Sequence, residues 1–115
     1  MKKTLAILMI LMSVALFGMT SFAASYSNKS GSISGTLKTY DSYSSATTSN
    51  SSGGNAYVYV KVKYISSSGE YLWSSKSETT GSSYASTSRK SPAGKVVGAE
   101  SGHGASKNSI NFNLP

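Results

Sequence analysis

The chain has 115 residues, with eleven lysine and arginine residues against four acidic ones, and its formal net charge is +7. It contains no cysteine, which excludes a disulfide scaffold and lipid attachment through a cysteine thiol. The basic residues are scattered, with Arg89-Lys90 the only adjacent pair beyond the first three residues, and this argues against a nucleic-acid-binding arm.

The first residues have the pattern of a signal peptide. Two lysines precede an apolar run over residues 5–17, which is shorter than the ~20 residues that a membrane-spanning helix needs. Small side chains before Ala24 predict cleavage there, so that residues 1–23 form the signal peptide and residues 24–115 form one small domain. We therefore expect a secreted, extracellular protein, or a periplasmic one if the host is Gram-negative, with no transmembrane segment after cleavage.

The composition of residues 24–115 favours β structure. All four methionines lie in the signal peptide and large aliphatic residues are few, while eight tyrosines supply much of the missing apolar area. Serine, threonine, glycine and asparagine separate the apolar residues, which never recur at helical spacing over three turns. The domain is therefore expected to be all-β with almost no helix.

The first part of the domain contains two predicted strands. Residues 24–31 show no strand pattern and are expected to be flexible. Ser32–Tyr40 alternates apolar and polar residues and is predicted to be a strand, in which Gly35 marks a bulge or the close approach of another backbone. A less regular strand is predicted over Ser42–Thr48, and Asn50–Asn55 is predicted to be a flexible loop.

The stretch Asn55–Ser75 is predicted to be a long β-hairpin and holds the densest large apolar residues of the domain. Its turn contains Gly69, which suits the positive φ of a short hairpin loop. In the first strand a period of two places three valines on one face: Val58, Val60 and Val62. The same period places tyrosines and lysines on the opposite face: Tyr57, Tyr59, Lys61 and Lys63.

Shorter elements follow the hairpin. We expect Ser77–Ser82 to be a loop or the tail of the hairpin, and a turn at Pro92. Strands are predicted over three further ranges: Ser83–Arg89, Lys95–Glu100 and Ser109–Leu114. Residues 102–104 are expected to loosen the chain between the last two. Six or seven short strands without helices predict a single-domain antiparallel β-sandwich, with a small barrel as the alternative.

One histidine invites a catalytic hypothesis. His103 follows Glu100 and Ser101, which are the residue types of a hydrolytic relay, but Ala99 stands where a nucleophile elbow has glycine. We expect His103 to lie in a loop or at a strand edge and to make a structural hydrogen bond. Catalysis and a binding or pH-sensing role are the alternatives.

The sequence offers few ligands for metals or cofactors. A single histidine, no cysteine and four separated acidic residues provide no pair of metal ligands at a useful spacing. The glycine spacing between Gly94 and Gly104 fits neither a phosphate loop nor a dinucleotide-binding turn. We expect no catalytic residues, no metal and no cofactor, and therefore a protein that is not an enzyme.

The outward face of the central hairpin is the candidate binding surface, formed by Tyr57, Tyr59, Lys61, Lys63 and Trp73. Aromatic rings beside lysines can hold sugar rings, acidic polymers or a protein partner. Core or cross-strand packing is the competing interpretation and is favoured for the tyrosines, and Trp73 is favoured as a core anchor. The two lysines can also keep the strand from pairing with another copy.

The organisation of the chain resembles that of small exported bacterial proteins, and this resemblance identifies no functional residue. Our first hypothesis is a non-enzymatic extracellular protein that binds an anionic cell-wall polymer, a glycan or a protein, as a monomer or with weak self-association, and that does not bind nucleic acid. The alternatives are a small secreted bacteriocin-like toxin, which the basic charge permits, and a self-associating matrix or surface component, which the β-prone hairpin permits.

Overall fold

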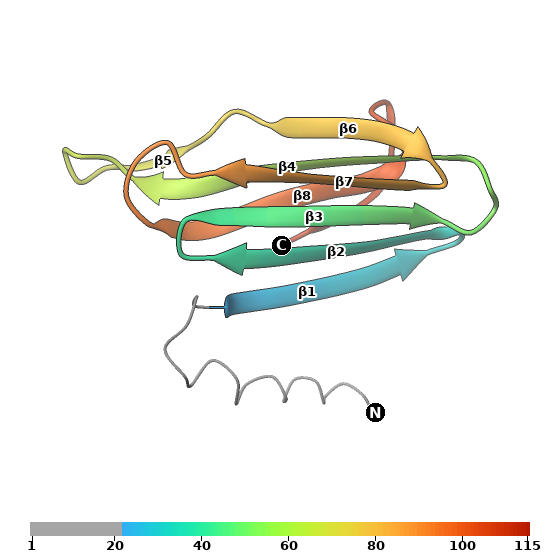
Figure 1. Ribbon diagram of the computed structural model, residues 1–115, viewed down its shortest axis with the longest axis horizontal. Helices are drawn as coiled ribbons and strands as arrows, with labels where there is room; N and C mark the ends of the chain where they lie inside the picture. The colour runs from blue at the N-terminus through green and yellow to red at the C-terminus, as the bar shows by residue number, and fades with distance from the viewer. Residues whose placement is uncertain (1–21) are drawn as a thin grey trace.

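The computed structural model describes residues 22–115, which form nine β-strands and no helix (Figure 1). The strands are β1 (Phe22–Ser30), β2 (Ile33–Tyr40), β3 (Tyr43–Asn50), β4 (Asn55–Ile65), β5 (Tyr71–Trp73), β6 (Ser77–Ser82), β7 (Tyr84–Lys90), β8 (Val96–Ser106) and β9 (Ser109–Leu114). Most of the predicted signal peptide lies outside the described residues.

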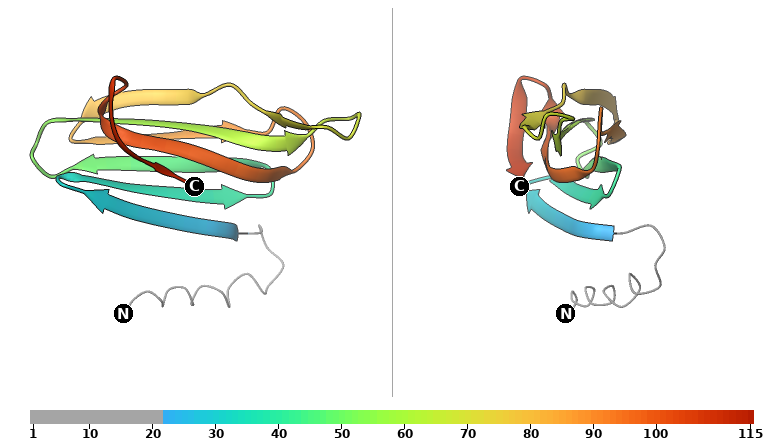
Figure 2. Two further views of the ribbon diagram at one scale, coloured as in Figure 1. Left: turned by 180° about the vertical axis from the view of Figure 1, so that it is seen from behind. Right: turned by 90° about the vertical axis from the view of Figure 1, so that its left-hand side faces the viewer.

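The strands form two antiparallel sheets. Sheet A has the order β1-β2-β3-β7, and sheet B has the order β5-β4-β8-β9, with β6 paired to the other half of β4. The chain passes from β6 into β7 at Ser83, whose φ is 59°. At the opposite edge β1 and β9 lie next to each other (Figure 2). The Asn111 side chain donates to the Ser30 carbonyl oxygen at 3.4 Å. The predicted all-β fold with two antiparallel sheets is confirmed.

The structure has more strands than the six or seven predicted, and β1 is one of the additions. The segment expected to be flexible, residues 24–31, instead pairs with β2 from Ala24 opposite Thr39 up to a tight turn at Gly31, whose φ is 61°. The structure differs from the expectation because the side chains of β1 are mostly small and polar. They lack the alternation that marks a strand in sequence, whereas the pairing itself depends on backbone groups.

Two other segments are more regular than expected. Residues 77–82 form β6 along β4 rather than a loop, and β8 continues through residues 102–104. Glycine usually weakens a strand. In β8, however, Gly102 and Gly104 leave space that a neighbouring residue occupies. The ring of Tyr59 fills the space over Gly102, and a Cβ at Gly104 would lie 2.0 Å from the Ser109 carbonyl oxygen of β9.

The core lies between the sheets, and the three valines of β4 are completely buried in it, as predicted. Val58 and Val60 belong to a cluster in which most other side chains are small: Leu37, Ala46, Ala56, Ala85 and Leu114. Such small side chains allow the two sheets to approach closely. Since the valines point toward sheet A, the opposite face of β4 points away from it.

Gly35 marks a close approach, but the neighbour is a side chain rather than a backbone, and no bulge is present. The register of β2 stays regular on both sides of Gly35. A Cβ atom at this position would lie 2.4 Å from Nδ1 of His103, which extends from sheet B. Gly35 therefore makes room for an imidazole ring between the sheets.

We predict that Gly35→Ala destabilises the protein by about 1–3 kcal/mol, because the added methyl group must displace the His103 ring in a packed interior. Urea unfolding followed by circular dichroism measures the change. Gly98→Ala is the matched control, since a Cβ there would make an ordinary 3.6 Å contact with the Cβ of Lys63. Equal losses of stability in the two variants would contradict the packing around His103.

Candidate functional site

The candidate site is the surface of sheet B that points away from the core. We call it the aromatic–lysine face, and it consists of Tyr57, Tyr59, Lys61 and Lys63 from β4 with Tyr71 and Trp73 from β5. The register places Trp73 opposite Lys63 and Tyr71 opposite Ile65, so the outward residues of the two strands share one side. The structure therefore brings all five predicted residues together and adds Tyr71.

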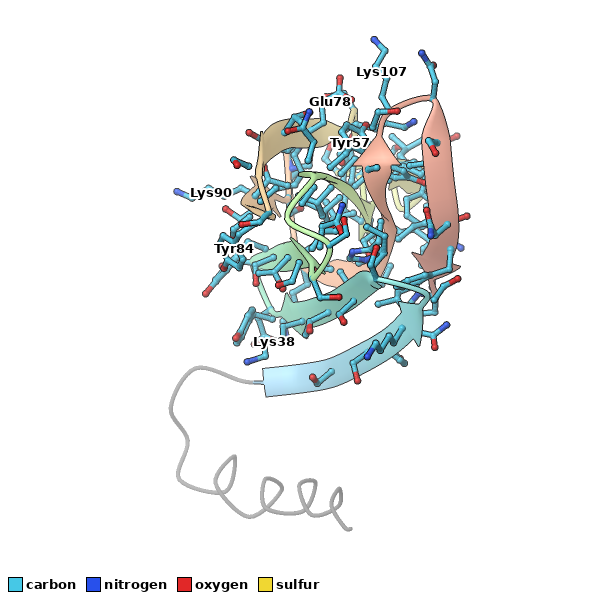
Figure 3. All side chains as sticks on the ribbon, turned by 90° about the vertical axis from the view of Figure 1, so that its right-hand side faces the viewer. Lys38, Tyr57, Glu78, Tyr84, Lys90 and Lys107 are labelled. Carbon is cyan, nitrogen blue, oxygen red and sulfur yellow. The ribbon has the colours of Figure 1, made fainter. Side chains whose placement is uncertain are left out.

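Two members of this face are packing residues. Tyr57 and Tyr59 are only 4% and 7% exposed, although no second sheet covers them. The hydroxyl of Tyr57 donates to the Glu78 carboxylate (Figure 3), and the hydroxyl of Tyr59 accepts a hydrogen bond from the Asn113 amide nitrogen at 3.0 Å. Cross-strand packing, the competing interpretation of these tyrosines, is what the structure shows.

Glycines explain how tyrosines become buried on an outer face. Tyr57 lies opposite Gly104 and Tyr59 lies opposite Gly102 on β8, so the neighbouring strand has no side chains beside the two rings. The ring of Tyr59 lies over Gly102, and Lys76 places its Nζ 4.2 Å from the centre of the same ring. Burial raises the pKa of both phenols, with Glu78 contributing for Tyr57 and Glu100 for Tyr59.

The two lysines of β4 lie against aromatic rings. The Nζ of Lys61 is 5.0 Å from the centre of the Trp73 ring and 3.2 Å from a carboxylate oxygen of Glu100. The Nζ of Lys63 is 5.4 Å from the centre of the Tyr71 ring and 6.0 Å from that of Trp73. Each such cation–π contact contributes about 0.5–1 kcal/mol at an exposed position. These contacts hold the ammonium groups beside the rings.

The rings of β5 are exposed, which corrects the expectation that Trp73 is a core anchor. Trp73 is 46% exposed and Tyr71 is 63% exposed. The physical reason is their place in the sheet, because β5 is a three-residue edge strand and Trp73 has the same orientation as Lys63. The hairpin register was the signal that could have identified this orientation from the sequence.

A hollow of about 400 Å³ adjoins this end of the face. Its lining includes Tyr26, Lys63, Trp73, Val97, Gly98 and Pro115. It forms where β9 stops, because β9 pairs with β8 only from Ser101 to Ser106 and leaves residues 96–100 without a β9 neighbour. Sequence reasoning missed Tyr26 because it lies in the segment expected to be flexible.

His103 is not in a loop or at a strand edge but in the interior of β8, and its side chain is completely buried. Its Nδ1 is 2.8 Å from the hydroxyl of Thr48 on β3, and its Nε2 is 2.7 Å from the hydroxyl of Ser101. The ring also stacks on Phe112, with 5.2 Å between the ring centres. The predicted structural hydrogen bond is present, and it joins sheet B to sheet A.

The geometry around His103 supports a structural role rather than a hydrolytic relay. Ser101 and His103 point into the core, whereas Glu100 lies on the outer face and pairs with Lys61. Burial lowers the pKa of His103 from its ordinary value of 6.5 to about 4, so the ring is neutral at pH 7. A neutral ring that accepts one hydrogen bond and donates another satisfies both hydroxyl groups without burying a charge.

Neither metal ligation nor similarity to other proteins identifies a site. Within residues 22–115 no three histidine, aspartate or glutamate side chains converge as metal ligands. The same part of the chain contains no helix with the length and apolar character that a membrane crossing requires. Comparison with protein-family models, curated proteins and solved structures gave no match. The proposed function therefore depends on the chemistry of the outer surface of the protein.

We predict that Tyr59→Ala destabilises the protein by about 3 kcal/mol or more, because it removes the ring that covers Gly102. Tyr59→Phe should cost only about 1 kcal/mol, since it removes the hydrogen bond to Asn113 and keeps the ring. Thermal unfolding of the two variants makes this comparison. If both variants were as stable as the unchanged protein, the tyrosine would be a surface residue and not a packing residue.

His103 should make stability depend on pH. The unfolded chain takes up a proton near pH 6.5, whereas the folded protein resists protonation down to about pH 4. The free energy of unfolding is therefore at its full value above pH 6.5. It decreases as the pH falls toward 4, by roughly 3 kcal/mol in total, because the unfolded chain then binds a proton that the folded protein does not bind. Urea unfolding at several pH values measures the loss, and His103→Gln should remove it.

A second measurement covers the case in which His103→Gln does not fold. Titration of the imidazole by NMR should show no protonation of the folded protein above about pH 5. An imidazole that titrates near pH 6.5 would contradict its burial as a neutral group.

Proposed function

We propose that the protein is a secreted, non-enzymatic protein that binds an anionic polysaccharide at a cell surface. The binding site in this proposal is the exposed end of the aromatic–lysine face together with the adjoining hollow. Its contact residues are Lys63, Tyr71 and Trp73, supported by Tyr26. The observation that carries the proposal is the exposure of the Tyr71 and Trp73 rings directly beside lysines, where Trp73 and Lys63 also line the hollow.

The two parts of the site suit the two parts of such a polymer. An indole or phenol ring offers a flat apolar surface for the face of a sugar ring, and an ammonium group pairs with a carboxylate or phosphate. Lys61 already pairs with Glu100, whereas Lys63 lies beside the rings of Tyr71 and Trp73. Lys63 is therefore the better placed of the two cations to pair with the acidic group of a ligand.

Charge and predicted export are consistent with this partner. Removal of the two lysines of the signal peptide lowers the formal net charge from +7 to +5. A basic protein outside the cell meets acidic glycans and wall polymers, and long-range attraction raises the rate of encounter with them. The buried pair Tyr57 and Tyr59 would act in this proposal as the support that holds β4 and β8 rigid beneath the exposed rings.

We predict that Trp73→Ala combined with Lys63→Gln weakens binding to polygalacturonate at least tenfold, because it removes both the stacking surface and the counter-charge. Isothermal titration calorimetry at two salt concentrations measures affinity and its ionic component. Lys107→Gln, in the turn between β8 and β9, is the matched charge control. Unchanged affinity in the double variant, or equal losses in the double variant and the control, would refute this site.

A further inference from the structure

The outer surface of sheet A forms a second face with a different composition. Side chains on β2, β3 and β7 alternate, with the inward residues largely buried and the outward ones partly or fully exposed. One cross-strand row consists of Ser27, Thr36, Thr47 and Ser86. We call this surface the serine–lysine face, because its outward residues are mostly serine and threonine and include three lysines: Lys29, Lys38 and Lys90.

The strands of this face carry charge of one sign. Glu78 and Glu100 belong to sheet B and Glu70 to the β4–β5 turn, whereas Asp41 lies in the β2–β3 turn at one end of the face. Lys38 and Lys90 are exposed, and neither has a carboxylate on the same sheet surface. In Figure 3 Lys38, Tyr84 and Lys90 lie on one side of the molecule, away from Tyr57 and Glu78.

Aromatic rings lie at both ends of the serine–lysine face. Tyr40 and Tyr43 stack at one end with 4.7 Å between their ring centres, and Tyr84 is 55% exposed at the other. Threonine is enriched in strands and serine is not, so strand propensity accounts for Thr36 and Thr47 but not for the serines beside them. Short hydroxyl side chains keep the surface flat and offer both donors and acceptors, at intervals of roughly 4.8 Å across the strands.

We propose that the serine–lysine face is a second binding surface for the same class of ligand, an anionic polysaccharide, so that the protein cross-links two polymer chains. Carboxylates of the polymer pair with the lysines, sugar hydroxyls bond to the serine and threonine rows, and the tyrosines contact the sugar rings at the ends. Cross-linking rests on the proposed function, because one of its two contacts is the aromatic–lysine face.

The arrangement of the sheets provides the geometry for cross-linking. The two faces lie on opposite sides of one core, since the valines of β4 and the inward residues of sheet A are buried against each other. A chain bound along one face therefore leaves the other open to a second chain. Two weak sites on a rigid domain bind a polymer network more tightly than either site alone.

The test compares two variants of the purified protein. The first carries Thr36→Val, Thr47→Val and Lys38→Gln, which remove hydroxyl groups and charge while keeping β-branched side chains. The second is Trp73→Ala with Lys63→Gln. Thr80→Val with Lys107→Gln makes the same two kinds of change outside the serine–lysine face, with one threonine fewer, and is the control. Calorimetry with short oligogalacturonate counts sites, light scattering with long polygalacturonate detects cross-linking, and circular dichroism checks the fold.

The expected result is two sites in the unchanged protein and in the control, one site in each of the other variants, and scattering only where two sites remain. One site in the unchanged protein overturns the proposal. If Trp73→Ala with Lys63→Gln removes that single site, the function proposed for sheet B stands without cross-linking. If the variant with Thr36→Val, Thr47→Val and Lys38→Gln removes that single site, the binding site proposed on sheet B is refuted as well. Equal binding of single-stranded poly-dT also overturns the proposal, because charge alone would then explain the affinity.

Discussion

The two-residue period of β4 is the constraint on which the rest of the structure depends. This strand pairs with β5, β6 and β8, and it places Val58, Val60 and Val62 in the core while Tyr57, Tyr59 and its two lysines face outward. A shift of one residue in its register would exchange the two sets, burying lysines and exposing valines. The position of every other strand in sheet B, and the chemistry of its outer surface, follows from this alternation.

Rings over glycines compensate for the scarcity of large aliphatic side chains. In the interior the imidazole of His103 lies over Gly35 and joins the sheets through the hydroxyl of Thr48. On the outer surface of sheet B the ring of Tyr59 lies over Gly102. In both places the missing Cβ is what admits the ring, so these glycines contribute to packing density rather than to chain flexibility. The hydroxyl groups of Thr48 and Ser101 are hydrogen-bonded to the imidazole nitrogens of His103, and the Asn113 amide donates to the hydroxyl of Tyr59.

The sequence was most informative where side chains alternate. The valine face of β4, the strand at Ile33–Tyr40 and the closing strand at Ser109–Leu114 were predictable from that pattern. It was least informative at β1 and β6, whose serine-rich side chains carry no alternation and whose pairing depends on backbone groups. The five residues of the candidate surface lie on one side of sheet B, but the burial of Tyr57 and Tyr59 was not predictable. Tyrosine burial depends on glycines across the ladder, and Trp73 exposure depends on hairpin register.

In the proposed function, the exposed rings and lysines of β4 and β5 are the principal contacts for an anionic polysaccharide on the outer faces of the sandwich. The decisive experiment is an NMR titration of the isotopically labelled protein with oligogalacturonate. If these residues hold the polymer, the signals of the Trp73 indole N–H and of the backbone amides of Lys63 and Tyr71 shift, while those of the buried amides of Val58 and Val60 do not. An indole signal that does not move while amides elsewhere shift would contradict the proposed function.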